Sequence, residues 1–345
     1  MGLNKESGIV IGKLKKGPNN LITDVKGVRV GHCTINKNKV KTGVTAILPH
    51  EGNIFKEKVM ASSCVINGFG KSMGLIQIEE LGTVETPIIM TNTLSVGTAA
   101  NGLIKYMLEQ NNDIGAVTGT VNCIITECND GRLNDIRGLH VREEHVYEAI
   151  KNAAEIFEEG AVGSGTGMCC YGLKGGIGSS SRVITLDNIE YTVGAIVMSN
   201  FGRRGDLIIN GEKVGEKIEK ADISDMEKGS VIIVIATDIP LSERQLKRVS
   251  KRSIVGLGRT GSYLGNGSGD ICISFTTANK IKHYSDTDII DIKMVDDNKL
   301  DNIFKAVIET VEESVISSLY HGETTVGVNG NEIKSLKDYL YYNIQ

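Results

Sequence analysis

Tryptophan is absent from this sequence, and aromatic residues make up only 5% of its 345 positions. With so few aromatic side chains, the chain lacks the material for an aromatic binding platform. Proline occurs only four times, which argues against a rigid proline-rich spacer between domains. A chain of 345 residues exceeds a comfortable single small domain, yet this length also fits one large α/β domain with a large core.

An excess of one charge and long apolar runs are also missing. Lysine and arginine total 38 against 42 aspartate and glutamate residues, and both signs are mixed along the chain. The weak net charge of -4 gives no field that would recruit a nucleic acid. No run of about 18 apolar residues would span a membrane, and residues 1–6 lack an apolar signal region. We expect a cytoplasmic protein with neither a nucleic acid nor a membrane as partner.

Cysteine and histidine lack the spacings of disulfide frameworks and metal sites. The seven cysteines are an odd number and include no C-x-x-C pair, so neither a disulfide framework nor a zinc site is indicated. The six histidines are scattered, and His140 and His145 are five positions apart, off a common helix face. The adjacent Cys169 and Cys170 fit two small core residues better than a redox site. We expect no metal and no organic cofactor.

Apolar runs rich in β-branched residues alternate with helical patterns. The runs predict buried strands at residues 43–48, 63–66, 87–91, 116–126, 191–198, 230–236 and 271–277. Apolar residues recur at helical spacing in residues 143–159 and 300–320, and a capping box from Ser242 to Gln245 marks the start of another helix. This alternation predicts a layered α/β domain.

A charged segment directly precedes one of these strands. More than half of residues 212–229 are charged, whereas apolar runs lie on both sides. We expect an exposed connector here. The segment ends at Gly229, and a core strand starts at once with Ser230, which is unusual for a surface loop.

Two short glycine motifs resemble known sites but lack the necessary context. Residues 70–72 match the end of a phosphate-binding loop, but Val65 stands where that motif needs a glycine. Residues 70–74 also match the G-x-S-x-G of a nucleophile elbow, but no signal supports His283 or His321 as the histidine partner that it requires. We expect a plain glycine-rich turn.

A third motif, G-x-G-x-x-G, spans residues 256–261. Dinucleotide-binding domains place this motif between a strand and a helix. Here it follows a predicted helix, so we expect a loop that ends the helix and no dinucleotide site.

Two further glycine-rich segments carry polar side chains that suggest a site. Residues 160–182 contain eight glycines and five serines or threonines, which suits either a flexible surface loop or a backbone that closely approaches a ligand or a subunit. Residues 266–270 lead into a predicted strand, where Ser268 and Asp270 share one side and the carboxylate can orient the hydroxyl. Taken alone, the second segment also fits a turn with local hydrogen bonds.

Together these segments resemble the DmpA-type family, the L-aminopeptidase/D-amino-acid esterases and β-peptidyl aminopeptidases, whose members cleave themselves before a nucleophilic Ser or Thr. The matching segments occur in order along nearly the whole chain, at residues 23–25, 31–32, 91–97, 129–135, 160–182, 200–204, 229–230 and 266–270. The resemblance implies a four-layer αββα sandwich of the N-terminal-nucleophile-hydrolase type. It also implies a homo-oligomer, a tetramer.

The resemblance implies cleavage between Gly229 and Ser230, which divides one catalytic domain into residues 1–229 and 230–345. Ser230 would then be the nucleophile at the start of the smaller chain. A serine hydroxyl is a poor nucleophile until a base accepts its proton, and an α-amino group has a reference pKa of about 7.7 to 8.0. Cleavage before Ser230 creates that base on the same residue, and Gly229, without a Cβ, can adopt the strained conformation that the cleavage requires.

Five more residues match the family's site. Asn200 matches the oxyanion donor, and Ser268 and Asp270 match a supporting Ser-x-acid pair. Glu127 matches a carboxylate near the substrate amine, and Asn129 is the second candidate for substrate binding. Members of the family have an aromatic residue near this point, whereas this sequence runs Cys-Asn-Asp-Gly-Arg from position 128.

The expected function is that of a self-cleaving serine aminopeptidase. Its substrates would be small peptides, amides or esters with a free amine, which Glu127 receives as an ammonium. One alternative keeps the fold but makes the chain an acyltransferase similar to ornithine acetyltransferases, which use threonine, so Ser230 counts against it. Another alternative is an uncut binding protein without activity.

Overall fold

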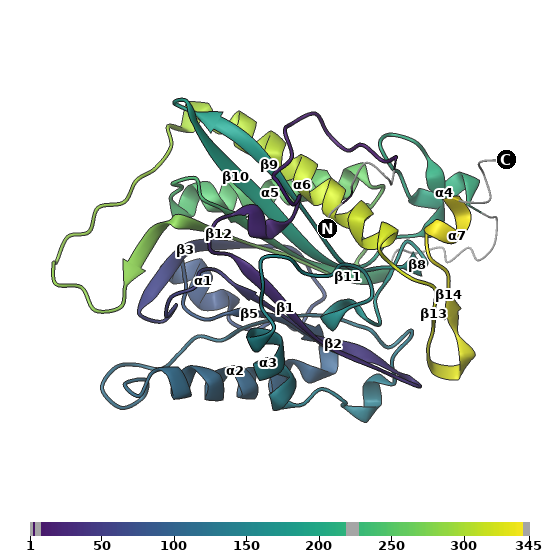
Figure 1. Ribbon diagram of the computed structural model, residues 1–345, viewed down its shortest axis with the longest axis horizontal. Helices are drawn as coiled ribbons and strands as arrows, with labels where there is room; N and C mark the ends of the chain where they lie inside the picture. Colours follow the sequence, from purple (N-terminus) through teal and green to yellow (C-terminus); the bar gives the residue numbers. More distant parts are fainter. Residues whose placement is uncertain (1–2, 4–7, 219–227, 341–345) are drawn as a thin grey trace.

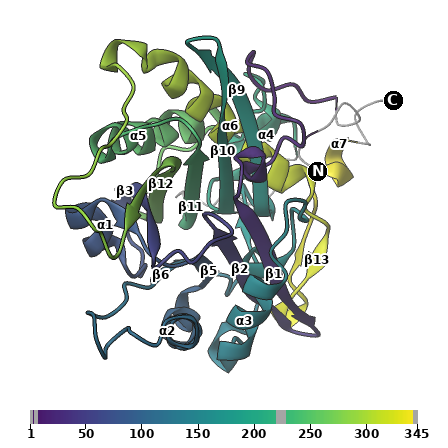
Figure 2. The same cartoon turned by 60° about the vertical axis from the view of Figure 1, so that its left-hand side comes forward.

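Two β-sheets lie face to face, with helices on their outer sides, in a computed structural model that describes residues 3, 8–218 and 228–340. Figure 1 shows the four layers stacked from top to bottom, and Figure 2 shows the same order from another side. This arrangement is the predicted αββα sandwich. No helix in the described part of the chain is both long and apolar enough to cross a membrane.

The smaller sheet has four strands in the order β1-β2-β5-β6. Its strands are β1 (Arg29–Lys37), β2 (Val40–Leu48), β5 (Ile88–Asn92) and β6 (Ile124–Cys128). Only β5 and β6 are parallel to each other. Helices α2 (Val96–Gln110) and α3 (Glu143–Lys151) cover the outer face of this sheet (Figure 1).

The larger sheet has six strands in the order β4-β3-β12-β11-β10-β9. They are β3 (Glu57–Gly68), β4 (Thr83–Val84), β9 (Gly176–Leu186), β10 (Ile189–Asn200), β11 (Lys228–Thr237) and β12 (Gly267–Lys282). Strands β11 and β12 run parallel at its centre. Helices α5 (Glu243–Arg259) and α6 (Asp301–Tyr320) cover its outer face (Figure 2).

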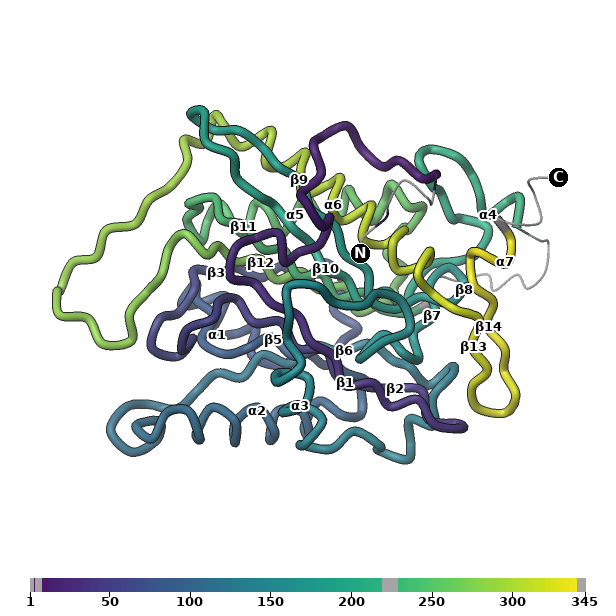
Figure 3. The backbone as a smooth tube through the Cα atoms, in the orientation of Figure 1, coloured from purple at the N-terminus to yellow at the C-terminus, as the bar shows by residue number. Residues whose placement is uncertain are grey.

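Smaller elements complete the chain. They are α1 (Leu75–Leu81), β7 (Cys169–Cys170), β8 (Leu173–Lys174), α4 (Val214–Lys217), β13 (Thr325–Val326), β14 (Glu332–Ile333) and α7 (Lys337–Leu340). Before it enters β1, the N-terminal segment passes over α6, as the tube in Figure 3 shows. The backbone N–H groups of Lys13 and Leu14 donate there to the carboxylate of Glu309.

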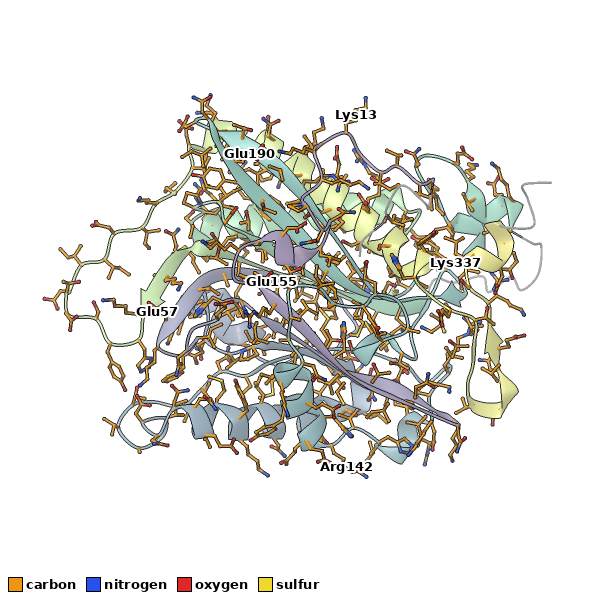
Figure 4. The ribbon with its side chains drawn as sticks, in the orientation of Figure 1. Lys13, Glu57, Arg142, Glu155, Glu190 and Lys337 are labelled. Carbon is orange, nitrogen blue, oxygen red and sulfur yellow. The ribbon has the colours of Figure 1, made fainter. Side chains whose placement is uncertain are left out.

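Alternate residues of the central strands face different layers. Along β11, Ile232 and Val234 pack in the core cluster that includes the smaller sheet, whereas Val231 and Ile233 pack in the cluster that includes α5 and α6. Side chains fill the space between the layers (Figure 4). Because successive side chains of a strand point to opposite faces, Ser230 continues the series that faces the smaller sheet.

Most predicted strands and helices are confirmed. Strands 43–48, 63–66, 191–198, 230–236 and 271–277 fall within longer strands, and the strand predicted at 87–91 is β5, shifted by one residue. Ser242 caps α5 as expected, since its Oγ accepts the Gln245 N–H at 3.3 Å while Gln245 Oε1 accepts the Ser242 N–H at 3.2 Å. The helix predicted at 300–320 is α6.

Two predicted elements are too long. The strand expected at 116–126 begins only at Ile124, because residues 116–118 all donate their N–H groups to the Asp113 carbonyl in a turn. The helix expected at 143–159 ends at Lys151, because Ala154 leaves the helix to exchange two backbone hydrogen bonds with Val30. In both cases backbone pairing, which the side-chain pattern does not encode, ends the element.

Two glycine-rich segments also differ from expectation. The loop predicted at 256–261 is wrong, because Gly256 and Gly258 lie inside α5 and the helix ends at Arg259. For residues 160–182 the flexible surface loop is wrong, because the segment is buried and runs through β7 and β8 into β9. At Gly178 a Cβ would lie only 2.0 Å from the Ser314 carbonyl oxygen of α6, so here glycine lets a helix approach the sheet closely.

The charged connector at 212–229 falls partly outside the described residues. In its described part, Glu212, Lys213, Glu216 and Lys217 are exposed, as predicted. Residues 219–227 lie outside the described part of the chain. The connector leads into β11, which starts at Lys228.

Candidate active site

Ser230 lies in the middle of the larger sheet, near the start of β11. Its register partners are Asn200 on β10 and Gly269 on β12. The preceding residue, Gly229, pairs with Ser268. The strand register therefore brings together four of the residues that the sequence singled out, from parts of the chain up to about 70 positions apart.

The hydroxyl of Ser230 contacts only backbone groups among the described residues. Ser230 Oγ donates to the Gly229 carbonyl oxygen at 2.7 Å and accepts the Gly269 N–H at 3.3 Å. The residue is 6% exposed. In the uncut chain the hydroxyl thus lies against the carbonyl that precedes it and has no basic side chain as partner.

Gly229 occupies a position that only glycine fits. Its φ of 140° lies in the region that other residues rarely adopt. A Cβ on Gly229 would also lie 1.9 Å from the carbonyl oxygen of Asn200. Conformation and space both require glycine before Ser230.

The side-chain amide of Asn200 is held at both ends. Its Oδ1 accepts the N–H of Cys169 at 2.9 Å, and its Nδ2 donates to the carbonyl of Asn129 at 3.0 Å. These two bonds fix which end of the amide is the donor. Nδ2 carries two hydrogens, so its second N–H can donate to another acceptor. This N–H lies on the strand next to Ser230.

Ser268 and Asp270 form the predicted hydroxyl–carboxylate pair. Ser268 Oγ donates to Asp270 Oδ1 at 2.6 Å, and both residues are buried. Their strand lies beside β11, where Ser268 is opposite Gly229. The pair therefore flanks the Gly229–Ser230 bond without a hydrogen bond to Ser230 Oγ.

Glu127 enters the site from the other sheet, near the end of β6. It is 2% exposed, its Oε1 accepts the Lys71 N–H at 2.8 Å, and its Oε2 accepts the hydroxyl of Thr93. No lysine, arginine or histidine forms an ion pair with Glu127 in the described part of the chain. Buried carboxylates are normally paired with a cation, so a carboxylate held only by neutral donors is a candidate to bind a cation from outside the chain.

Gly70 lies between Glu127 and β12, the strand beside the one that carries Ser230. A Cβ built on Gly70 would lie 3.6 Å from Glu127 Oε1 and 3.7 Å from Gly269 Cα. The prediction of a plain turn at residues 70–74 missed this contact. The turn binds Glu127 through the backbone N–H of Lys71, and a motif of side chains does not reveal a backbone donor.

Ser72, His283 and His321 bond with none of the site residues in the described part of the chain, whereas Asn129 does contact Asn200. Ser72 Oγ has no hydrogen-bond partner in the described structure, so Ser72 lacks the base that a nucleophile elbow needs. His283 Nε2 bonds with Thr118, and His321 Nδ1 with Ser317. Asn129 contributes its carbonyl, while its exposed side chain accepts the N–H of a neighbouring glycine.

Asp130 is a buried acid beside the site that the sequence did not reveal. It is 0% exposed, and its Oδ1 accepts the side-chain amide of Asn134 at 3.0 Å. Burial raises the pKa of Asp130 from 3.8 to about 6, against the lowering effect of hydrogen bonds from Thr42, Asn134 and Asn92. Among the described residues, no group of three or more potential ligands forms a metal site.

Comparisons with known proteins identify the family of the chain. The model of Peptidase family S58 matches residues 20–333. The β-peptidyl aminopeptidase BapA of Sphingosinicella microcystinivorans is 37% identical over 347 residues, which cover 93% of this chain and 86% of that protein.

Solved structures match over almost the full length. The crystal structure of the PH0078 protein from Pyrococcus horikoshii OT3 has a TM-score of 0.94 and 55% identity, covering 99% of this chain and 98% of that one. The L-aminopeptidase D-Ala-esterase/amidase of Ochrobactrum anthropi is described as a prototype for the serine aminopeptidases and a variant of the Ntn hydrolase fold. It has a TM-score of 0.91 and 35% identity, covering 98% and 96%. The family model and the sequence identity show that the chain belongs to Peptidase family S58.

Proposed function

We propose that this protein cuts itself between Gly229 and Ser230 and then acts as a serine aminopeptidase with Ser230 as its nucleophile. The observation that carries the proposal is the contact of Ser230 Oγ with the carbonyl of Gly229, at 2.7 Å, and no basic side chain among the described residues bonds with this hydroxyl. Membership of a peptidase family with serine aminopeptidases among its solved structures supports the class of reaction.

In the first step the hydroxyl oxygen of Ser230 attacks the carbonyl carbon of Gly229. The bond from that carbon to the Ser230 nitrogen breaks, the hydroxyl proton passes to the nitrogen, and an ester links Gly229 to Oγ. Water then hydrolyses the ester and leaves a Gly229 carboxylate and a free α-amine on Ser230. Glycine allows this arrangement, because its φ of 140° is one that other residues rarely adopt.

The new amine then serves as the base for catalysis. With a reference pKa of about 7.7 to 8.0, it accepts the hydroxyl proton near neutral pH. Ser230 Oγ attacks the substrate carbonyl, and the spare N–H of Asn200 stabilises the oxyanion, a contribution of roughly 2.7 to 4 kcal/mol in comparable sites. Water releases the acyl group, and no step uses a metal or an organic cofactor.

Ser268 and Asp270 have a supporting role in this scheme. They flank the Gly229–Ser230 bond, so their hydroxyl–carboxylate pair lies beside the amine that cleavage creates. The Ser268 hydroxyl donates its hydrogen bond to the Asp270 carboxylate. Its oxygen is then free to accept a hydrogen bond from the new amine. The pair then orients the base toward Ser230 Oγ.

Glu127 gives the site its specificity. A buried carboxylate without a cation in the described chain suits the ammonium of a substrate's N-terminal residue. The substrates are therefore small peptides, amides or esters with a free amine. From the family resemblance the proposal extends to a homotetramer in the cytoplasm, and the mass of the native particle tests the tetramer.

The test compares Ser230→Ala with Ser72→Ala by intact mass and by hydrolysis of aminoacyl amides. Wild type and Ser72→Ala should each give two chains, residues 1–229 and 230–345, whereas Ser230→Ala should remain one chain of 37.2 kDa without activity. A processed and active Ser230→Ala variant would show that another residue is the nucleophile. Loss of processing only in Ser72→Ala would favour the nucleophile elbow.

A further inference from the structure

Lys174 is a fully buried lysine whose ammonium, among the described residues, bonds only with backbone carbonyls. Its Nζ donates to the carbonyl oxygens of Gly165 at 3.0 Å, Met168 at 2.9 Å and Gly175 at 2.7 Å. It is 0% exposed, and no carboxylate forms an ion pair with it in the described part of the chain. Burial lowers the pKa of Lys174 to about 8.

Burying a cation without a counter-ion is unfavourable, and a core residue of similar shape would fill the space without that penalty. The ammonium must therefore do something that an apolar side chain cannot. Its three bonds all go to the segment 165–175, which folds around it. The lysine thus fixes the shape of this glycine-rich segment.

One peptide group connects Lys174 with the candidate oxyanion donor. The carbonyl of Met168 accepts from Lys174 Nζ, and the N–H of the same peptide group, which belongs to Cys169, donates to Asn200 Oδ1 at 2.9 Å. The Gly175 N–H also donates to the Met168 carbonyl, at 3.1 Å. A positive charge on the carbonyl polarises the peptide group and strengthens its N–H as a donor.

The orientation of the Asn200 amide depends on this peptide group. If the N–H of Cys169 moved away, the amide could turn over and direct Oδ1 instead of Nδ2 toward the reacting carbonyl. An oxygen in that place would repel the oxyanion that a donor stabilises. The bond from Nδ2 to the Asn129 carbonyl supports the same orientation from the other end.

We propose that Lys174 is a positioning residue for the aminopeptidase reaction, which holds the Met168–Cys169 peptide group so that Asn200 presents an N–H to the oxyanion. The inference rests on the proposed function, since it assumes that Asn200 stabilises the oxyanion. Lys174 itself touches neither the substrate nor Ser230. It acts through one peptide plane, and its loss affects the transition state more than substrate binding.

The test is a double-mutant cycle between Lys174→Met and Asn200→Ala, measured on protein whose intact mass shows two chains. Lys174→Met keeps the length of the side chain and removes its charge and donors. We expect kcat for an aminoacyl amide to fall about tenfold to a hundredfold, with KM within about twofold of wild type. In the Asn200→Ala background, Lys174→Met should cause no further loss of kcat.

A destabilised control separates positioning from general loss of stability. Val307→Ala removes buried side-chain volume from α6, away from the site, and should lower the melting temperature without changing kcat. If single variants slow self-cleavage, the same cycle is run on the rate constant of cleavage. Additive losses in the double variant, or a raised KM with kcat intact, would overturn the inference.

The outcomes also separate this inference from the function on which it rests. Wild-type kcat in Lys174→Met together with an inert Ser230→Ala refutes only the role of Lys174. Activity in Ser230→Ala refutes the proposed function itself.

Discussion

The two sheets meet at the site but contribute groups of different kinds. The larger sheet holds Ser230, Asn200 and Ser268 through strand register, so backbone geometry sets their spacing. The smaller sheet contributes Glu127, a single charge held by one backbone N–H and one hydroxyl. We infer that chemistry depends on the backbone of one sheet and recognition on a charge from the other. Changes in the larger sheet should therefore abolish the reaction, whereas changes in the smaller sheet should alter its selectivity.

The largest effect is expected at Gly229. Gly229→Ala introduces a Cβ that would lie 1.9 Å from the Asn200 carbonyl oxygen, at a φ that alanine rarely adopts. The strand cannot keep its present path, so the precursor should remain uncut and inactive by intact mass and amide hydrolysis. Gly258→Ala is the matched control, since a Cβ there meets nothing within 4 Å, and it should be processed normally. Normal processing of Gly229→Ala would show that the tight contact has no role.

A smaller and more selective effect is expected at Glu127. Glu127→Gln keeps the shape of the side chain but removes the charge that faces the substrate ammonium. Loss of one partner of a buried charge pair weakens the pair by about 2 kcal/mol or more, so kcat/KM for free-amine substrates should fall by about thirtyfold or more. Self-cleavage places no ammonium beside Glu127, so the variant should cleave itself at the wild-type rate.

The control for this prediction is the ratio of activities on free-amine and N-acetylated substrates. Because acetylation removes the ammonium, wild type should prefer the free amine, and Glu127→Gln should lose much of that preference. Equal activity of the wild type on both substrates would contradict the role of Glu127.

The smallest effect on catalysis is expected at Asp130, where a change should act on stability. The folded state raises the pKa of Asp130 from 3.8 to about 6, so between these values it binds more protons than the unfolded state. Stability from this group is present below about pH 4 and is lost as the pH rises through 6. The loss amounts to about 3 kcal/mol at pH 7 for a shift of about two pKa units.

The Asp130→Asn variant has no group that titrates at this position. It therefore tests whether Asp130 makes the protein less stable as the pH rises. Relative to wild type, the variant's free energy of unfolding should increase by about 2 kcal/mol between pH 4 and pH 7 in denaturant titrations, because a small part of the loss has already occurred at pH 4. A difference that stays constant with pH would mean that Asp130 is charged in the folded protein without penalty.

Some parts of the site could be predicted from the sequence because they follow from local patterns. The alternation of a strand predicted that Ser268 could bond with Asp270, and the capping box predicted the start of α5. The sharp change from charged to apolar residues after Gly229 predicted the core strand that carries Ser230. In each case neighbouring side chains carry the information.

The parts that could not be predicted depend on backbone groups from distant segments. The N–H of Lys71 holds Glu127, and the N–H of Cys169 holds Asn200. Neither contact can be predicted from the pattern of side chains, because the donors are backbone groups. Strand β9 was hidden because glycine and serine replace the usual β-branched residues where α6 packs closely. The buried Lys174 had no signal, since its partners are carbonyls that every residue carries.

The central claim is that one peptide bond, between Gly229 and Ser230, separates the precursor from the enzyme. N-terminal sequencing of the purified, active protein tests this claim most directly. The account predicts two chains, the smaller of which begins with residues 230–233, Ser-Val-Ile-Ile. Full activity in a preparation that consists of a single unbroken chain, or a new N-terminus at another residue, would contradict it.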